Sequence, residues 1–361
     1  MKPHQATAPI QRDAARRGRG APMPLPSPRL LRHRLPCPPE TATRVRLARG
    51  AIRDILYGRD PRRLVAVVGP CSIHDPDQAM EYALRLARLA RDTRGQLVVV
   101  MRTYFEKPRT AVGWKGLIND PDLDGSCDGA RGLERARRLL LDINALGLAC
   151  AAEVLDPMTV PYLEDLLSWA CIGARTSESQ IHRELASRLP MPVGFKNRTD
   201  GNLKTAQDAL VTARRPHTFF GIDDDGRPAL HRSPGNPDAH LVLRGGGGVP
   251  NHDPEVVAWA ATRARQLGLV RPVWVDCSHG NSNQNHLLQG SVCRHVLDQV
   301  RGGHQVIGGL MLESFLEAGS QPFAPGAELR RGVSITDGCI DWNETEELLR
   351  AATRAVSGAR I

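Results

Sequence analysis

The chain has 361 residues, 41% of them hydrophobic, which is enough for one large domain or two smaller ones. Its formal net charge of +9 is uneven, because residues 1–36 hold eight basic residues against one acidic residue and so contribute +7. The remaining chain is close to neutral, which argues against a nucleic-acid-binding body. Apolar runs stay well short of the roughly 18–20 residues that cross a bilayer, so we expect no membrane partner.

The first 36 residues are rich in Arg, Pro and Ala and show no hydrophobic period. We expect a disordered or loosely attached N-terminal extension, followed by a single domain over residues 37–361. The extension lacks the interleaved aromatic residues of nucleic-acid-binding tails and the hydrophobic core of a signal peptide. Eight scattered cysteines without a Cys-x-x-Cys motif suit a reducing compartment, so we expect a cytoplasmic protein.

The predicted elements begin with a helix over residues 41–57, capped by Thr41. From Leu64 on, short apolar runs alternate with amphipathic stretches. The eight runs cover residues 64–68, 97–101, 148–152, 169–173, 192–195, 240–243, 272–275 and 306–311. Apolar strands separated by helices indicate a parallel sheet covered on both faces. Eight such units predict a (β/α)8 TIM barrel, with a doubly wound open sheet as the alternative.

One segment departs from this repeat. Residues 218–222 and 228–232 flank an Asp-Asp-Asp-Gly-Arg turn and predict a β-hairpin inserted before the sixth barrel strand. Such an insertion is either a functional surface, an interface between subunits or a decoration of the barrel.

The first predicted strand leads to Cys71. Gly69-Pro70 stops the strand, and Asp75-Pro76 opens a helix, since Asp is a good N-cap and Pro fits the first helical turn. In α/β proteins, ligands bind at the edge where strands end. Cys71 is therefore expected at the ligand-binding edge.

Every predicted strand ends at a charged or metal-capable residue. These residues are Cys71, Arg102, Glu153, Arg175, Lys196, Arg244, His279 and Glu313. Catalytic groups of barrel enzymes lie at the carboxyl ends of the strands, so we expect one shared site. The cationic members, with Lys107 and Arg109 just beyond them, suit an anion that carries phosphate and carboxylate.

The other strand-end residues include Cys71, His279 and Glu313. Thiolate, imidazole and carboxylate together suit a divalent metal ion such as Mn, Fe, Co or Zn, and an Asp from a following loop could join them. Two alternatives remain open for Cys71. It could be a small buried hydrophobe, or a nucleophile with His279 as its base.

Several long motifs resemble type I 3-deoxy-D-arabino-heptulosonate 7-phosphate (DAHP) synthases. They are Gly-Pro-Cys-Ser-Ile-His-Asp (69–75), Met-Arg-Thr-Tyr-Phe-Glu-Lys-Pro-Arg-Thr (101–110), Gly-Trp-Lys-Gly-Leu-Ile-Asn-Asp-Pro (113–121), Ile-Gly-Ala-Arg-Thr-Ser-Glu-Ser-Gln-Ile-His-Arg-Glu-Leu-Ala (172–186), Gly-Phe-Lys-Asn (194–197), Leu-Arg-Gly-Gly (243–246), Asp-Cys-Ser-His-Gly-Asn-Ser (276–282) and Ser-Ile-Thr-Asp-Gly-Cys (334–339). The resemblance covers residues 40 to 350 in the family's order. It implies a catalytic barrel domain that condenses phosphoenolpyruvate with erythrose 4-phosphate, the first step of the shikimate pathway.

The resemblance also implies residue roles. The implied metal ligands are Cys71, His279, Glu313 and Asp337. The implied phosphoenolpyruvate ligands are Arg102, Arg175, Lys196 and Arg244, with the amide of Ala174 near the phosphate. The implied erythrose 4-phosphate end is formed by Lys107, Pro108, Arg109 and Thr110. Family analogy further implies a homodimer or homotetramer, and an aromatic amino acid as a possible effector.

Two catalytic hypotheses follow from this chemistry. Lys107 would donate a proton to the new alkoxide, and Glu153 would orient the attacking water. Arg198 departs from the family, which usually has Gly at this position, and it could contact phosphate, alter the second substrate or point outward. A paralogue that uses another phosphorylated aldehyde and a regulatory homologue without turnover are the alternative functions.

Overall fold

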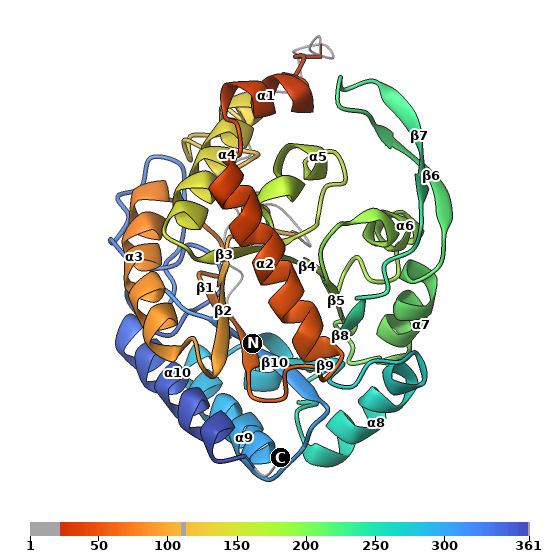
Figure 1. The fold of residues 1–361 in the computed structure, drawn as a ribbon. Coiled ribbons are helices and arrows are strands. Elements are labelled where there is room, and N and C mark those ends of the chain that lie inside the picture. Colours follow the sequence, from red (N-terminus) through yellow and green to blue (C-terminus); the bar gives the residue numbers. More distant parts are fainter. Residues whose placement is uncertain (1–21, 110–112, 360–361) are drawn as a thin grey trace, which may run out of the picture.

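The computed structural model describes residues 22–109 and 113–359, and eight parallel strands form a closed barrel at its centre (Figure 1). The strands follow each other around the barrel in the order β1-β10-β9-β8-β5-β4-β3-β2. Their bounds are β1 Leu64–Gly69, β2 Leu97–Arg102, β3 Ala149–Glu153, β4 Trp169–Ile172, β5 Val193–Lys196, β8 His240–Leu243, β9 Val273–Asp276 and β10 Ile307–Glu313. The predicted (β/α)8 barrel is confirmed, and the open-sheet alternative is wrong.

Helices surround the barrel, as expected for strands that are buried on both faces. They are α2 Pro39–Leu56, α3 Pro76–Thr93, α4 Gly129–Ala145, α5 Val160–Leu163, α6 Gln180–Arg188, α7 Lys204–Ala213, α8 Pro254–Gln266, α9 Gln289–Arg301 and α10 Trp342–Ser357, with short 3-10 turns η2 Glu164–Leu166, η3 His279–Ser282 and η4 His286–Leu288. Helix α3 starts as predicted, because the Asp75 side chain accepts hydrogen bonds from the amides of Asp77 and Gln78. Helix α2 starts earlier than predicted, with Pro39 in its first turn, so Thr41 is a buried helical residue and not its cap.

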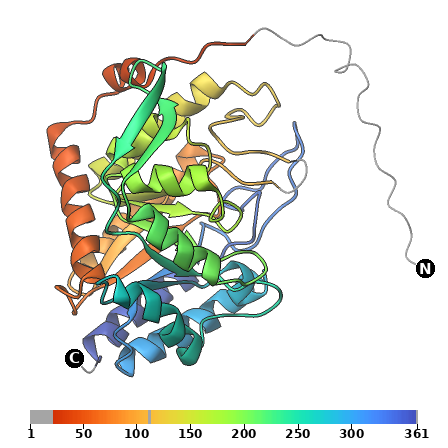
Figure 2. The same cartoon turned by 90° about the vertical axis from the view of Figure 1, so that its right-hand side faces the viewer.

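Helix α2 crosses one end of the barrel (Figures 1 and 2). The carbonyl of Leu56 accepts hydrogen bonds of 3.0 Å from the amides of Val270 and Arg271, just before β9 begins. Helix α2 therefore closes the end at which the strands start, and the opposite end is left for the loops that follow the strands.

Strand β10 closes the barrel by pairing with the first strand. In this register Gly69 lies beside Glu313. Gly309 in β10 faces Trp274, and a Cβ atom at this position would lie 2.7 Å from the indole ring, so a side chain would not fit there. The pairing places the loop after β1 next to the end of β10, which are far apart in the sequence.

The predicted hairpin is present as β6 His217–Ile222 and β7 Pro228–Ser233. It lies outside the barrel beside helix α1, Pro28–Arg34 (Figure 1). The amide of Arg29 donates a 2.8 Å hydrogen bond to the carbonyl of Asp224, and Arg32 pairs with the Asp224 carboxylate. Leu31 is fully buried. The expectation of disorder is therefore wrong for residues 28–34, while residues 1–21 lie outside the described part of the chain.

Among the residues that the structure describes, no helix is both long and apolar enough to cross a lipid bilayer.

Candidate active site

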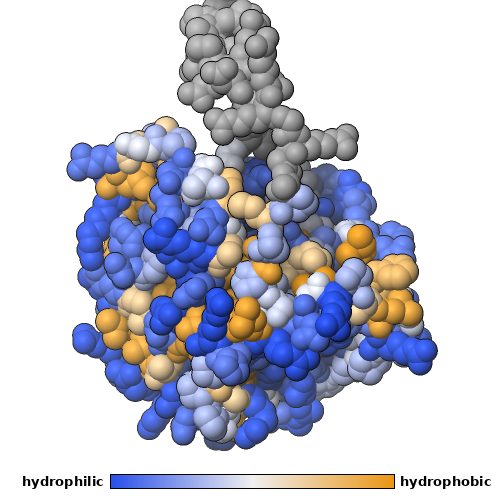
Figure 3. All heavy atoms as spheres, turned by 90° about the horizontal axis from the view of Figure 1, so that it is seen from above, coloured by the Kyte–Doolittle hydropathy of each residue, from blue (hydrophilic) through white to orange (hydrophobic). Residues whose placement is uncertain are grey.

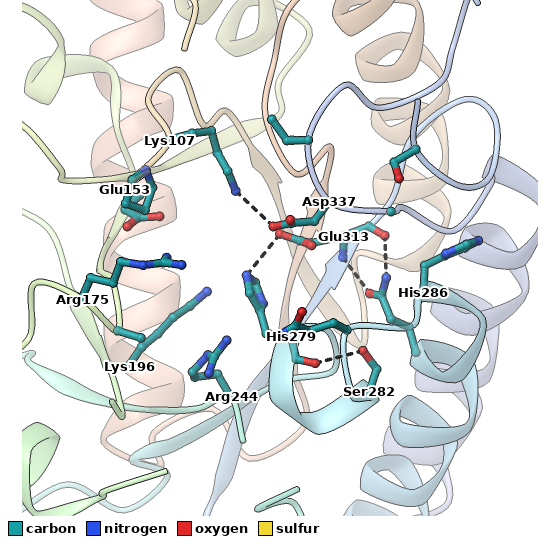
Figure 4. A pocket seen from close by; sticks show the side chains of 18 of the residues that line it. Lys107, Glu153, Arg175, Lys196, Arg244, His279, Ser282, His286, Glu313 and Asp337 are labelled. Atoms are coloured by element: carbon teal, nitrogen blue, oxygen red, sulfur yellow. Dashed lines mark hydrogen bonds and ion pairs between the residues drawn. The ribbon is translucent and has the colours of Figure 1, made fainter. Parts of the chain in front are cut away.

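A pocket of about 520 Å³ lies at the carboxyl ends of the barrel strands (Figure 4). Eleven of the predicted site residues line it, namely Lys107, Pro108, Arg109, Glu153, Ala174, Arg175, Lys196, Arg244, His279, Glu313 and Asp337. Cys71 and Arg102 are buried beside this pocket, and Thr110 lies outside the described residues. Lining residues that the sequence did not predict include Ser282, Gln284, His286, Gln289, Ser320 and Thr336.

Three of the four predicted metal ligands form one cluster, and the fourth, His279, lies beside Glu313. One ligand atom each from Cys71, Glu313 and Asp337 lies within 4.8 Å of the others. The Sγ atom of Cys71 is 3.3 Å from Oδ2 of Asp337, and Nε2 of His279 is 3.5 Å from Oε1 of Glu313. A thiol, an imidazole and two carboxylates are donor types that divalent transition metals accept.

The side chain of Lys107 places a positive charge against this cluster. The Lys107 ammonium donates to Sγ of Cys71 at 2.9 Å and lies 3.6 Å from Oδ2 of Asp337. The charge of Lys107 lowers the pKa of Asp337 to about 2, against the opposing effect of burial. Burial and the nearby Glu313 raise the pKa of the Cys71 thiol. The cluster thus favours a positive charge at its centre, which is what a metal ion would provide.

The opposite side of the pocket is cationic. Arg175, Lys196 and Arg244 point toward the cluster from the ends of three neighbouring strands (Figure 4). Arg175 is exposed, whereas Lys196 and Arg244 are buried. The backbone amide of Arg244 donates to Oδ1 of Asn197 at 2.8 Å, which fixes the loop that carries its side chain. Such a wall suits a phosphate or carboxylate group.

Asp276 is a buried site residue that the strand-end reasoning missed. Its Oδ2 atom lies 2.7 Å from Nζ of Lys196 and 3.0 Å from Nδ1 of His279. Burial alone would raise the pKa of Asp276, but the charges of Lys196 and His279 hold it well below its usual range. Asp276 therefore positions both a predicted substrate ligand and a predicted metal ligand. Its place three residues before His279 was the available signal.

Arg102 lies below the pocket floor and is fully buried. Its Nη2 atom is 3.0 Å from Oε1 of Glu313, and its guanidinium stacks 3.9 Å above the centre of the Tyr104 ring. Nη1 has no hydrogen-bond partner among the described residues. An anion bound above Arg102 would satisfy this donor.

Arg109 and Glu153 line the pocket from the loop after β2 and from the end of β3. Nε of Arg109 donates to the Trp114 carbonyl at 2.7 Å, which holds the loop after β2 in place. Glu153 packs against Gly173, where an added Cβ atom would lie 2.1 Å from the Glu153 carboxylate. A side chain at position 173 would therefore displace Glu153.

Arg198 points away from the pocket. Its guanidinium lies 2.5 Å from Glu178 and 3.0 Å from Asp200, and it is not among the pocket-lining residues. Of the three interpretations of this position, the outward orientation is the one observed.

The fold and this pocket define a barrel enzyme. One side of its site is cationic and suits an anionic substrate, and the other side carries a cluster of side chains that can bind a metal ion. The model of the DAHP synthetase I family matches residues 39–350, and the chain belongs to this family.

Curated relatives and a solved structure agree with this assignment. The Tyr-sensitive phospho-2-dehydro-3-deoxyheptonate aldolase of Escherichia coli (strain K12) is 50% identical over 335 residues, covering 92% of this chain and 94% of that protein. The Trp-sensitive enzyme of Enterobacter agglomerans is also 50% identical, over 322 residues, covering 89% and 92%. The structure of the aldolase from Francisella tularensis SCHU S4 superposes with a TM-score of 0.90 at 41% identity, covering 94% of this chain and 99% of that one.

Proposed function

We propose that this pocket condenses phosphoenolpyruvate with erythrose 4-phosphate and water, giving DAHP and phosphate, the first step of aromatic biosynthesis. The observation that carries the proposal is the cationic wall facing the thiol, imidazole and carboxylate cluster, in a chain 50% identical to enzymes named for this reaction. Lys107, Glu153 and the whole cationic set are present, so neither a paralogue with another aldehyde nor a homologue without turnover gains support.

The cations would hold phosphoenolpyruvate. Arg175, Lys196 and Arg244 line the pocket, whereas Arg102 lies deeper, where a low local dielectric strengthens its attraction for an anion. The Nη1 atom of Arg102, which has no hydrogen-bond partner among the described residues, would donate to the bound phosphoenolpyruvate. We assign the phosphate to the side near the amide of Ala174, which also lines the pocket.

Lys107, Pro108, Arg109 and Thr110 would form the erythrose 4-phosphate end. We propose that Cys71, His279, Glu313 and Asp337 hold a divalent metal ion of the Mn, Fe, Co or Zn class. When bound, such an ion supplies Lewis-acid polarisation of the substrate aldehyde. Asp276, 3.0 Å from Nδ1 of His279, and the Ser278 hydroxyl, hydrogen-bonded to the same atom at 2.6 Å, would fix the His279 ring and leave Nε2 directed at the cluster.

Two residues would handle protons and water. Lys107, whose ammonium reaches the cluster, would donate a proton to the new alkoxide. Glu153 would orient the water that adds to the carbon next to the attacking enol carbon. In the same assay as below, Glu153→Gln should lower turnover with little change in substrate binding; unchanged turnover would remove this role.

A steady-state assay of phosphoenolpyruvate consumption tests the function. We expect consumption only when erythrose 4-phosphate is present, release of one phosphate per turnover, and loss of activity with EDTA that added Mn²⁺ restores. Absence of phosphate release with both substrates and Mn²⁺ would overturn the proposal. A panel of other phosphorylated aldehydes distinguishes a paralogue, which would turn over one of them faster.

We further infer a cytoplasmic enzyme with an aromatic effector. All eight cysteines lie in the described part of the chain as free thiols. The relatives are named Tyr-sensitive and Trp-sensitive at equal identity, so the effector must be found by adding Phe, Tyr and Trp singly.

We also propose a homodimer or homotetramer, to be tested by sedimentation equilibrium. The hairpin exposes Phe220 (87%) and Leu230 (58%), and hydrophobic patches interrupt the hydrophilic surface on the side of α1 (Figure 3). Such patches are typical of surfaces that a second subunit covers.

A further inference from the structure

A second group of side chains that could bind a metal ion lies outside the pocket, at the rim of the barrel. This rim cluster consists of His252 and Asp253, at the start of α8, and His295, in the middle of α9. One ligand atom from each lies within 4.8 Å of the others. The two imidazole rings are 5.0 Å apart between centroids and nearly perpendicular, at 78°.

Polar atoms in the cluster and next to it lack hydrogen-bond partners among the described residues. Nδ1 of His252 is buried and has no hydrogen-bond partner among the described residues. Asp253 is the N-cap of α8, yet its carboxylate accepts no hydrogen bond from the helix, the usual role of an Asp at this position. Gln299 follows His295 by one helical turn, and its Oε1 atom is also buried without a partner in the same part of the structure.

Ion pairing within the protein does not account for this arrangement. Nε2 of His295 is 4.0 Å from Oδ1 of Asp253, and both side chains are largely exposed, so this pair contributes little. The Nδ1 atom of His252, which has no hydrogen-bond partner among the described residues, is a nitrogen that can coordinate a metal ion. Two imidazoles and a carboxylate are a common ligand set for transition metals.

We propose that the rim cluster binds a divalent transition-metal ion of the Zn²⁺, Ni²⁺ or Co²⁺ class. Tetrahedral coordination with metal–ligand bonds near 2.0–2.1 Å brings ligand atoms to roughly 3.3 Å from one another. Asp253 and His295 reach this spacing by side-chain rotation, because both are exposed. The Gln299 amide donates to the His252 carbonyl at 2.6 Å, which fixes the backbone of the least exposed ligand.

The bound ion would tie the loop after β8 to α9. Asn251, next to His252, accepts a 2.7 Å hydrogen bond from the amide of Gly245 and donates to Asn197 at 3.1 Å. Asn197 also accepts from the amide of Arg244. An ion at the rim therefore stabilises the loop that carries Arg244, without contacting the pocket.

Zinc stoichiometry of the full-length protein tests the proposal. Equilibrium dialysis against Zn²⁺ with elemental analysis should give one more ion per chain in the wild type than in His295→Ala. His33→Ala, which removes an exposed histidine of α1, is the matched control and should bind as many ions as the wild type. Cys71→Ser should retain the rim ion, which separates this site from the pocket cluster.

The affinity of the rim ion gives a second measurement. His295→Ala should weaken Zn²⁺ binding at the rim cluster by more than roughly 100-fold. Loss of a residue that only supports a ligand costs roughly 10–100-fold, and His295 would be a ligand itself. With Co²⁺ in Cys71→Ser, the spectrum should lack thiolate-to-metal charge transfer, since the rim offers no sulfur. The proposal is overturned if His295→Ala, shown to be folded by circular dichroism, binds as many ions as the wild type. If that variant does not fold, His252→Asn must lose the same ion.

Discussion

Lys196 and Asp276 form a buried ion pair, with 2.7 Å between Nζ and Oδ2, at the base of the pocket. The same carboxylate oxygen lies 3.0 Å from Nδ1 of His279. One aspartate thus connects the cationic wall with the thiol, imidazole and carboxylate cluster, and it stands in the last position of β9.

Asp276→Asn should destabilise the protein and abolish turnover. The change leaves the Lys196 ammonium buried without its partner, which costs about 3–5 kcal/mol, and it removes the carboxylate that orients His279. Urea denaturation and the steady-state assay measure the two effects. Asp200→Asn is the matched control, because Asp200 is exposed and its ion pair with Arg198 lies at the surface; equal stabilities of the two variants would contradict the prediction.

Cys71→Ser should lose pocket-bound metal and activity together, while the barrel stays folded. Serine keeps the size of the side chain but is a poor ligand for a transition metal, and position 71 packs beside Asp337 and Glu313. Metal content, circular dichroism and turnover are measured on the same sample. Cys127→Ser, at an exposed position, should leave all three unchanged. A Cys71→Ser variant that kept metal and activity would remove Cys71 from the ligand set.

Lys107→Met should reduce kcat by about 100–10,000-fold, the usual contribution of a general acid. Metal content must be measured in parallel, because Lys107 contacts both Cys71 and Asp337. Lys115→Met is the control, since Lys115 is exposed on the same loop. If turnover of Lys107→Met equals that of the control, another group donates the proton.

Glu106 should make stability depend on pH. Burial, together with the charges of Asp156 and Glu153, raises its pKa to about 8, although a hydrogen bond from Thr159 opposes this. Because the folded pKa lies above the unfolded value near 4.5, the stabilisation is complete below pH 4.5 and is lost as pH rises to about 8.

The unfolding free energy of the wild type should therefore fall relative to that of Glu106→Gln over this window, by at most about 5 kcal/mol. Denaturation at a series of pH values measures the difference. Glu134→Gln, at an exposed site of α4, should follow the wild type. Parallel curves for wild type and Glu106→Gln would show that Glu106 does not titrate in this range.

Arg198→Ala should leave the KM for phosphoenolpyruvate within about twofold of wild type, because its surface ion pairs contribute little. Arg244→Ala should raise the same KM by about 10–150-fold, the equivalent of a lost charge-assisted hydrogen bond of about 1.5–3 kcal/mol. A rise for Arg198→Ala comparable to that for Arg244→Ala would place Arg198 in the substrate site.

The barrel could be predicted from the sequence because each strand is a short apolar run that is buried along its length, as in β1 and β2. The same apolar runs also predicted which residues stand at the strand ends, and eleven of the predicted site residues line the pocket. Asp276 was missed because it directly follows the apolar run of residues 272–275 and the strand-end residue was assigned to His279, three positions later, although the Asp276 side chain is fully buried.

Other features depended on contacts between distant segments. The Lys107–Cys71 contact requires the loops after β1 and β2 to fold toward each other, and nothing in the local sequence specifies that approach. The order of residues 28–34 comes from ion pairs with the hairpin and from burial of Leu31, which outweigh a composition typical of disorder.

The pairing of β1 with β10 also bears on how the chain folds. Cys71 follows the first strand, whereas Glu313 and Asp337 come from the end of the last strand and the segment after it. These groups meet only when the barrel closes, which is a contact of high sequence separation and therefore a slow step. During synthesis Cys71 meets Glu313 and Asp337 only after nearly the whole chain has emerged, and the completed cluster then connects the first and last strands. A metal ion bound by this cluster would therefore stabilise the closed barrel by linking residues that follow its first and last strands.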